Sequence, residues 1–216
     1  MTRSIDSNPA WLPYARLNLY RNPFGELAPE ERAELASLDT APWVELLRQR
    51  RTAVQFIGGC GRGKTTRMLR LRRELPESSY VYLPEDGPCP VIAEGDPIMI
   101  DEAQRLPRRA RKSVFAAGNA LVLATHRDLR RILVRYGYRC RTFRIGPDNS
   151  PDLIREVMNR RIEASRLHDG PTLTLSHTEA VKLSQRFGTD LRSMENYLYE
   201  RLQQQLENNG QVRFVD

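Results

Sequence analysis

The chain has 216 residues, of which 40% are hydrophobic and 28% are charged, and its formal net charge is +7. These values are typical of one domain, or one domain with a small appendage, that buries a real core. No run approaches the roughly 18 apolar residues of a membrane span, and the N-terminus lacks the apolar core of a signal peptide. We therefore expect a cytoplasmic protein whose three cysteines, Cys60, Cys89 and Cys140, are reduced, because they have no metal-binding spacing.

Residues 1–50 are expected to form an N-terminal extension. Its first part is rich in turn residues, and helical sequence follows at 29–38 and again at 42–50. Trp43 and two following leucines recur at helical spacing, which gives the second helix an apolar face. That face either packs on the core or lines a pocket for an adenine ring.

A glycine-rich loop follows a strand-like run at 52–57 and precedes a run of helix-forming residues. From Gly58 to Thr65 the loop fits the phosphate-loop pattern G-x-x-x-x-G-K-[ST] at every fixed position. Backbone N–H groups at a helix N-terminus bind phosphate with the help of the helix dipole, and glycines let the backbone approach closely. The sequence therefore predicts a nucleotide site formed by Gly58, Gly59, Cys60, Gly61, Arg62, Gly63, Lys64, Thr65 and Thr66.

A second signature follows a short strand at 79–83 and a segment, 84–96, that has too many breaks for a full crossover helix. Four residues of buried-strand character end at Asp101 and Glu102, as expected at the carboxyl edge of a parallel sheet. In this arrangement Lys64 would reach the β- and γ-phosphates, Thr65 would ligate Mg²⁺ and Asp101 would hold it through water. Glu102 would polarise the attacking water.

The region 105–144 is strongly basic. Between Glu102 and Ile145 twelve Arg or Lys residues stand against two acidic residues. Two predicted helices, 106–117 and 128–137, flank a continuous apolar strand at 120–124, and 139–145 alternates like a further strand. His126 follows the apolar strand, where it either supports catalysis next to Glu102 or is structural.

The charge of this region has more than one explanation. It suits a nucleic acid or another anionic partner, and a solvated helix face explains it equally well. A third explanation is a protein partner, or pairs between subunits with the acids near Glu30, Glu31 and Glu34.

The pattern changes to helices alone after a linker at 145–151. Helices are expected at 152–167, 177–187 and 191–208, the second with a capping box formed by Ser176 and Glu179, and a last strand is expected at 211–215. The predicted fold is thus α/β, with a P-loop NTPase parallel sheet flanked by helices in 51–146 and a small helical lid domain in 147–216.

The order of these features resembles the AAA+ class of ATPases over roughly residues 20 to 205. The run from Ile100 to Leu106 is most similar to the subgroup of transposition regulators and secretion-type ATPases. The loop at Gly58 is similar to Walker A and the strand ending at Glu102 to Walker B. The resemblance implies a sensor-1 strand ending at His126 and a sensor-2 arginine at Arg192 that contacts the γ-phosphate. It also implies an arginine finger at Arg139 that acts on the nucleotide of a neighbouring subunit, hence a homo-oligomer.

The leading hypothesis is a Mg²⁺-dependent ATPase that couples ATP binding and hydrolysis to assembly or to a partner. One alternative is a STAND-type regulatory switch, which exchanges nucleotide and does not cycle rapidly. A small-molecule or nucleoside kinase is another, since kinases also carry a phosphate loop. A kinase would hold the arginines of its lid within the crossovers of the sheet. In this chain the helices follow the last strand, which favours the other two hypotheses.

Overall fold

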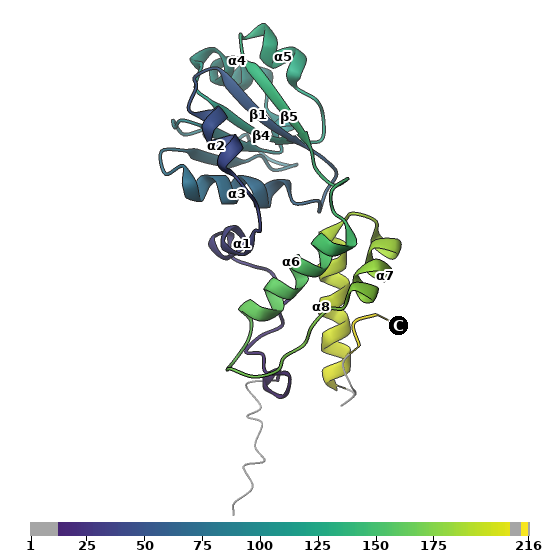
Figure 1. Ribbon diagram of the computed structural model, residues 1–216. Coiled ribbons are helices and arrows are strands. Elements are labelled where there is room, and N and C mark those ends of the chain that lie inside the picture. The colour runs from purple at the N-terminus through teal and green to yellow at the C-terminus, as the bar shows by residue number, and fades with distance from the viewer. Residues whose placement is uncertain (1–12, 208–212, 216) are drawn as a thin grey trace, which may run out of the picture. The chain divides into compact units, whose positions relative to one another are not determined.

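The computed structural model describes residues 13–207 and 213–215 (Figure 1), and the chain divides into two compact units. Residues 28–148 form one unit, which we call the α/β unit. Residues 13–27, together with 149–207 and 213–215, form the other, which we call the helical unit. Of the segment predicted as an N-terminal extension, residues 13–27 thus fall in the helical unit and residues 28–50 in the α/β unit.

A five-stranded sheet of order β2-β3-β4-β1-β5 lies at the centre of the α/β unit, and all its neighbouring strands are parallel. The three inner strands are buried along their whole length, as continuous apolar runs of a sheet covered on both faces should be. The predicted strands are confirmed to within one residue: β1 (Thr52–Ile57), β2 (Ser79–Tyr82), β3 (Ile98–Asp101), β4 (Leu121–Thr125) and β5 (Arg139–Arg144).

Helices cover both faces of this sheet. Side chains of α2 (Ala41–Leu47) and α3 (Lys64–Glu74) form one core with Val54 and Phe56 of β1. Side chains of α4 (Arg108–Ala117) and α5 (Arg130–Arg135) form a second core on the opposite face. The remaining elements are α1 (Pro29–Leu35), which packs on α3, and a short 3-10 helix, η2 (Ala103–Arg105).

Trp43 of α2 packs edge-on against two rings of the sheet. Its ring centroid lies 4.9 Å from that of Phe56 and 5.7 Å from that of Phe143. The apolar face of this helix therefore packs on the core, which was the first of its two interpretations. The segment between β2 and β3 contains no helix or strand from residue 83 to 97, as its prolines and glycines predicted.

The helical unit contains α6 (Pro151–Ala164), α7 (His177–Phe187) and α8 (Leu191–Glu207), with a short 3-10 helix, η1 (Ala15–Leu17). The predicted capping box is present at the start of α7, where Ser176 and Glu179 satisfy each other's backbone N–H groups. Apolar residues of all three long helices share one core with Leu19 and Phe24 of the N-terminal segment.

Buried polar contacts explain why residues 13–27 belong to the helical unit. Arg161 of α6 is 5% exposed, and its Nε donates to the carbonyl of Pro23 at 2.8 Å while its Nη1 donates to Glu195 at 2.7 Å. Asn22 donates to the carbonyl of Tyr199 at 3.2 Å. Helical periodicity identifies an apolar face but does not say which core that face joins. The sequence therefore did not predict how the N-terminal residues divide between the two units.

The C-terminal strand was expected at 211–215. Residues 211 and 212 lie outside the described part of the chain, and 213–215 are not a strand. Phe214 packs edge-on against Phe24, with ring centroids 5.8 Å apart. Among the helices of the described residues, none combines the length and the apolar character needed to cross a membrane.

Gln55 is a fully buried amide in the middle of β1, one of the three inner strands. Its Nε2 donates to Asp128 Oδ1 and to Thr142 Oγ1, both at 2.8 Å, and its Oε1 accepts from the backbone N–H of Leu129 at 2.8 Å. The N–H of Arg130 and, with a smaller effect, Gln55 hold the pKa of Asp128 below its usual range. Gln55 thus ties the turn after β4 and the strand β5 to β1.

Replacing Gln55 with leucine should destabilise the α/β unit, because Leu129 N–H and Thr142 lose a buried partner. Each buried polar group left unsatisfied costs about 1–3 kcal/mol, so we expect the free energy of unfolding, measured in urea, to fall by about 2 kcal/mol or more. Val134→Ala is the control, since Val134 is 55% exposed and surface changes usually stay within about 0.5 kcal/mol. Equal stability of the two variants would contradict the role given to Gln55.

Candidate functional site

The glycine loop leaves β1 at the carboxyl edge of the sheet, between the ends of two neighbouring strands. Gly58 N–H donates to the carbonyl of Thr125 at 3.3 Å, which joins the loop to the end of β4. A Cβ atom on Gly58 would lie 2.4 Å from the carbonyl oxygen of Ile145, just after β5. Only glycine therefore fits at this position, because the neighbouring atom belongs to the backbone.

Helix α3 begins at Lys64, directly after Gly63, which has φ +92°. The left-handed conformation turns the chain sharply into the helix and is open to glycine at little cost. The first N–H groups of the helix, at Lys64, Thr65 and Thr66, point out of its N-terminus, where they can bind an anion. Lys64 is 5% exposed, and its Nζ donates to the carbonyls of Gly58 and Gly59 at 2.9 and 2.8 Å.

Two arginines, Arg62 of the loop itself and Arg67 of α3, contact the backbone of the loop and its neighbours. The side chain of Arg62 packs between Gly59 and Gly146, where a Cβ on Gly146 would lie 2.6 Å from Arg62 Cδ. Arg67 donates from Nη1 to the carbonyl of Gly63 at 3.2 Å. Burial lowers the pKa of Arg67, and the charge of Asp148 opposes that shift. The loop is thus in contact with the segment that follows β5.

Asp101 at the end of β3 joins the two predicted motifs. Its Oδ2 accepts from Thr65 Oγ1 at 2.7 Å and from the hydroxyl of Tyr80 at 3.2 Å, and its Oδ1 accepts from the backbone N–H of Glu102 at 3.0 Å. Asp101 is 1% exposed. All three donors are neutral, so these hydrogen bonds orient the buried carboxylate without cancelling its charge.

The donor set fits a magnesium ion held together with phosphate oxygens. A hydroxyl and a carboxylate oxygen meet here at the N-terminus of α3, and Mg²⁺ is usually bound through one or two carboxylates plus substrate phosphates. Among the described residues there is no group of three or more His, Cys, Asp and Glu that could hold a metal by itself. A metal at this point would need further ligands, which phosphate oxygens or water can supply.

Glu102 has a left-handed backbone, with φ +59°. Such a conformation is unfavourable for a non-glycine residue, and it is found most often at functional sites. Its side chain is 14% exposed, and its Oε2 accepts from Gln104 Nε2 at 2.5 Å and lies 3.3 Å from Nε2 of His126. Gln104 also accepts, through Oε1, from the backbone N–H of His126 at 3.1 Å.

The structure therefore brings Glu102 and His126 together, with Gln104 bridging them. His126 Nε2 also lies 3.9 Å from the thiol of Cys60 in the glycine loop, so the histidine is next to the predicted phosphate site.

All three cysteines are free, as predicted.

Arg139 is not part of this cluster, and Arg192 belongs to the other unit. Arg139 begins β5 and pairs in register with Thr52, at the amino edge of the sheet, while Arg144 pairs with Ile57 next to the loop. At about 3.3 Å per residue, Arg139 lies about 16 Å along the strand from the carboxyl edge. Arg192 is an exposed residue in the first turn of α8, in the helical unit.

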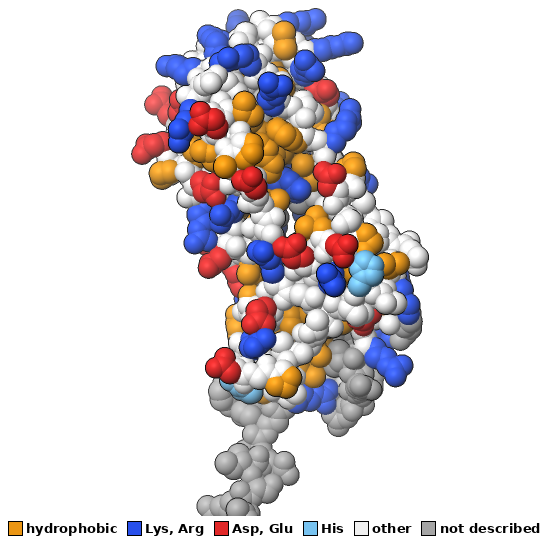
Figure 2. All heavy atoms as spheres, viewed as in Figure 1, with side chains coloured by type: hydrophobic (Ala, Val, Ile, Leu, Met, Phe, Trp, Pro, Cys, Tyr) orange, Lys and Arg blue, Asp and Glu red, His pale blue; other side chains and the backbone are white. Residues whose placement is uncertain are grey.

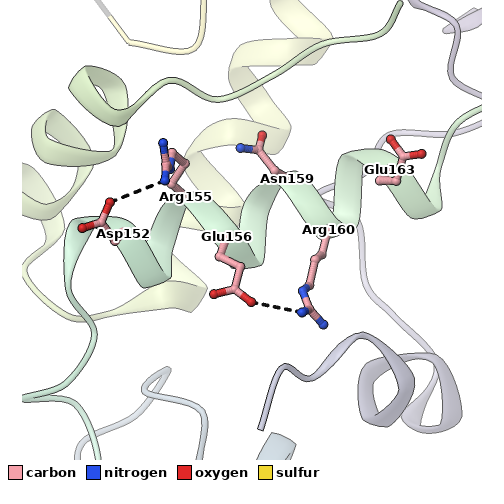
Figure 3. Close-up of a pocket in the computed structure, with 6 residues that line it drawn as sticks. All are labelled: Asp152, Arg155, Glu156, Asn159, Arg160 and Glu163. Carbon is pink, nitrogen blue, oxygen red and sulfur yellow. Dashed lines mark ion pairs between the residues drawn. The ribbon is translucent and has the colours of Figure 1, made fainter. Parts of the chain in front are cut away.

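A shallow pocket lies along the outer face of α6, and we do not assign a function to it (Figure 3). The residues that line it all come from this one helix, and their charges pair with each other: Arg155 with Asp152 at 3.6 Å and Arg160 with Glu156 at 3.1 Å. Asn159 donates a hydrogen bond to the carbonyl of Leu175 and accepts one from the N–H of the same residue. These contacts are those of a solvated helix face.

Tyr80 and Gln104 are members of the site that the sequence analysis did not single out. Gln104 stands two residues after Glu102, so its closeness in sequence was the available signal. Tyr80 reaches Asp101 from the neighbouring strand β2. No pattern in the sequence predicts that contact, because it depends on how the two strands are paired.

Comparisons with known proteins show a likeness of fold. No family model matches the chain, and no curated protein matches its sequence. The crystal structure of Cdc6p from Pyrobaculum aerophilum is similar with a TM-score of 0.51 and 15% identity, over 98% of this chain and 66% of that chain. A DNA replication initiation factor is similar with a TM-score of 0.39 and 14% identity, over 87% of this chain and 76% of that chain.

This chain thus spans slightly less than two thirds of the Cdc6p structure. At 15% identity the likeness shows the fold and does not by itself carry over an activity. The fold is α/β, with a parallel sheet of P-loop NTPase type flanked by helices and followed by a helical segment. At the level of the fold, the likeness to Cdc6p agrees with the α/β architecture that the motifs predicted.

Proposed function

We propose that the protein is a Mg²⁺-dependent ATPase of AAA+ type that couples its nucleotide state to assembly or to a partner. The hydrogen bond of 2.7 Å between Thr65 Oγ1 and Asp101 Oδ2 carries this proposal. It joins the phosphate loop to the acidic end of β3 at the edge of the sheet where nucleotides bind in α/β folds. Gly58, the N-terminus of α3 and Lys64 lie beside it.

The loop and Lys64 would bind the phosphates. The N–H groups at the start of α3 supply donors and a partial positive charge without any side chain. The ammonium group of Lys64 already lies over the loop, on the carbonyls of Gly58 and Gly59, from which it would turn to the β- and γ-phosphates. Bound Mg²⁺, held by Thr65 and Asp101, would neutralise charge that develops on the phosphate oxygens.

Glu102 would polarise the attacking water as a general base. Gln104 and His126 both contact its Oε2, so they would fix the direction of the carboxylate toward the γ-phosphate. Because Gln104 also binds the backbone at His126, a shift in the turn after β4 would move the base. This coupling offers a route by which a partner or a neighbouring subunit changes the rate.

Turnover without an acceptor separates this proposal from its alternatives. A kinase needs an acceptor for rapid phosphoryl transfer, and a STAND-type switch exchanges nucleotide without rapid cycling. The helices that follow the last strand, α6 to α8, support an AAA+ lid over a kinase lid.

Lys64→Ala removes the main cation of the phosphate site, so ATP binding, measured by titration with a fluorescent analogue, should be abolished or strongly weakened. Equal ATP affinity of Lys64→Ala and the wild type would refute the site.

Glu102→Gln separates chemistry from binding. It keeps the shape of the side chain but cannot accept a proton, so ATP should bind normally while hydrolysis falls by about 10²-fold or more. Unchanged turnover of Glu102→Gln would move the catalytic role elsewhere.

Arg139 would act on the nucleotide of a neighbouring subunit. It lies at the amino edge of the sheet, farther from the carboxyl edge than an arginine side chain extends, so it cannot reach the phosphate loop of its own chain. It is exposed, and its guanidinium contacts Gln49. An arginine supplied in trans stabilises the charge of the transition state. Arg192 of the helical unit would contact the γ-phosphate, a role that rests on the resemblance alone.

An arginine finger is worth about 10³–10⁵ in rate, so hydrolysis per subunit should rise with protein concentration, and Arg139→Ala should remove that rise. Mixing Arg139→Ala subunits with Lys64→Ala subunits should restore part of the activity at mixed interfaces. Arg141→Ala is the matched control, since Arg141 is exposed on the same strand two residues further on. A lack of both concentration dependence and rescue would leave Arg139 as a surface residue.

Nucleic acid is the partner that the surface charge favours. Lys and Arg side chains gather at the end of the α/β unit where Figure 1 places α4 and α5, as Figure 2 shows. Nine basic side chains of region 105–144 other than Arg139 are exposed, and none of them forms an ion pair with a described residue: Arg108, Arg109, Lys112, Arg127, Arg130, Arg131, Arg135, Arg141 and Arg144.

The cations of α6 behave differently, because Arg155 and Arg160 pair with acids of their own helix. Glu34, one of the acids considered for pairs between subunits, already lies 3.7 Å from Arg73. Cations left without ion pairs over several elements suit a phosphate backbone, which would be followed without base recognition.

Binding of labelled duplex and single-stranded DNA should therefore be detectable at low salt and fall steeply with salt. On duplex DNA each phosphate contact contributes about −0.9 to the log–log slope, so Arg108→Gln with Arg131→Gln should reduce the slope by about 2. The control, Arg155→Gln with Arg160→Gln, removes the same charge from the helical unit and should leave the slope unchanged. If neither DNA binds at low salt, with or without ATP, the basic surface serves protein contacts.

A further inference from the structure

We propose that Tyr80 is a positioning residue for the metal site, and that its hydroxyl fixes the carboxylate of Asp101 in the orientation that binds Mg²⁺. The inference rests on the proposed function, since it concerns the same nucleotide site. It adds a residue of β2 that belongs to neither the phosphate loop nor the acidic motif.

Three hydrogen bonds define the orientation of Asp101, and Tyr80 is the one donor that comes from outside the two motifs. Its hydroxyl donates to Oδ2 at 3.2 Å, the oxygen that also accepts from Thr65 Oγ1 at 2.7 Å. The backbone N–H of Glu102 holds Oδ1 at 3.0 Å. With both oxygens held, the carboxylate plane is fixed, and Thr65 can turn its oxygen toward a cation while Tyr80 still holds Oδ2.

The ring of Tyr80 is itself held in place. Tyr80 pairs in register with Met99 on β3, and its ring is partly buried against the core that α2 and α3 share with the sheet. On its face lies the guanidinium of Arg72, with Cζ 5.6 Å from the ring centroid. Packing therefore leaves the hydroxyl little freedom to leave Asp101.

The hydroxyl donates this hydrogen bond without carrying a charge. A neutral donor suits this position, because it orients the carboxylate without competing with Mg²⁺ for the charge of Asp101.

Partners that orient a metal ligand affect the metal more than the fold. Their loss typically costs about 10–100-fold in metal affinity or activity. Tyr80→Phe removes one oxygen atom and keeps the ring, so the packing against Arg72 and the core remains. We expect the Mg²⁺ concentration that gives half-maximal binding of a fluorescent ATP analogue to rise about 10-fold or more. Affinity for the same analogue in EDTA should not change.

Tyr136→Phe is the matched control, because Tyr136 is a partly buried tyrosine of the same unit that packs on Phe115, away from the site. Thermal melting followed by circular dichroism establishes that both variants are folded. A second variant, Tyr80→Leu, removes the ring as well and should raise the Mg²⁺ requirement at least as far.

The outcomes are distinct. A higher Mg²⁺ requirement in Tyr80→Phe alone supports the inference, since a purely structural role would weaken binding in EDTA to the same extent. An unchanged Mg²⁺ requirement, with normal binding by the wild type, overturns the inference and leaves the proposed function intact. Absence of Mg²⁺-dependent nucleotide binding in the wild-type chain overturns the proposed function, and the inference with it.

Discussion

The hydrogen bond from Thr65 to Asp101 is the contact on which the candidate site depends. The two residues come from α3 and β3, and β3 is separated from β1 by β4 in the sheet. Their meeting therefore requires the register that aligns Ile57 with Thr125 and Ile100 with Leu123. Buried apolar residues on both faces set that register, because a shift of one residue would turn every inward side chain to the opposite face. The core thus fixes the position of the site.

Two charged groups around this contact are buried and hydrogen-bonded to neutral partners at the edge of the sheet. Asp101 is buried with neutral donors on both oxygens, and Lys64 rests on backbone carbonyls. Glu102 adopts a left-handed backbone that costs about 1–2 kcal/mol. Binding of a cation beside Asp101 would offset the cost of burying its charge, which agrees with the proposed nucleotide site.

The two units divide the remaining features of the chain between them. The α/β unit contains the candidate nucleotide site, Arg139 and the basic surface, whereas the helical unit contains Arg192. The N-terminal segment belongs to the helical unit because its Pro23 accepts a hydrogen bond from Arg161 of α6 and its Asn22 donates one to Tyr199 of α8. The phosphate loop is in contact with two residues that follow β5. Gly58 lies against Ile145, and Arg62 lies against Gly146, shortly before the chain enters the helical unit.

The sequence by itself determined the strands, the glycine loop and the acidic end of β3, because buried strands and phosphate loops have local patterns of residue type and spacing. It also predicted the capping box of α7 from Ser176 and Glu179. Only the tertiary structure assigned the N-terminal residues to two different cores, and only it placed Tyr80 on Asp101 and Gln104 between Glu102 and His126. Such contacts depend on which strands pair and how side chains pack between elements, and neither is encoded in a local pattern.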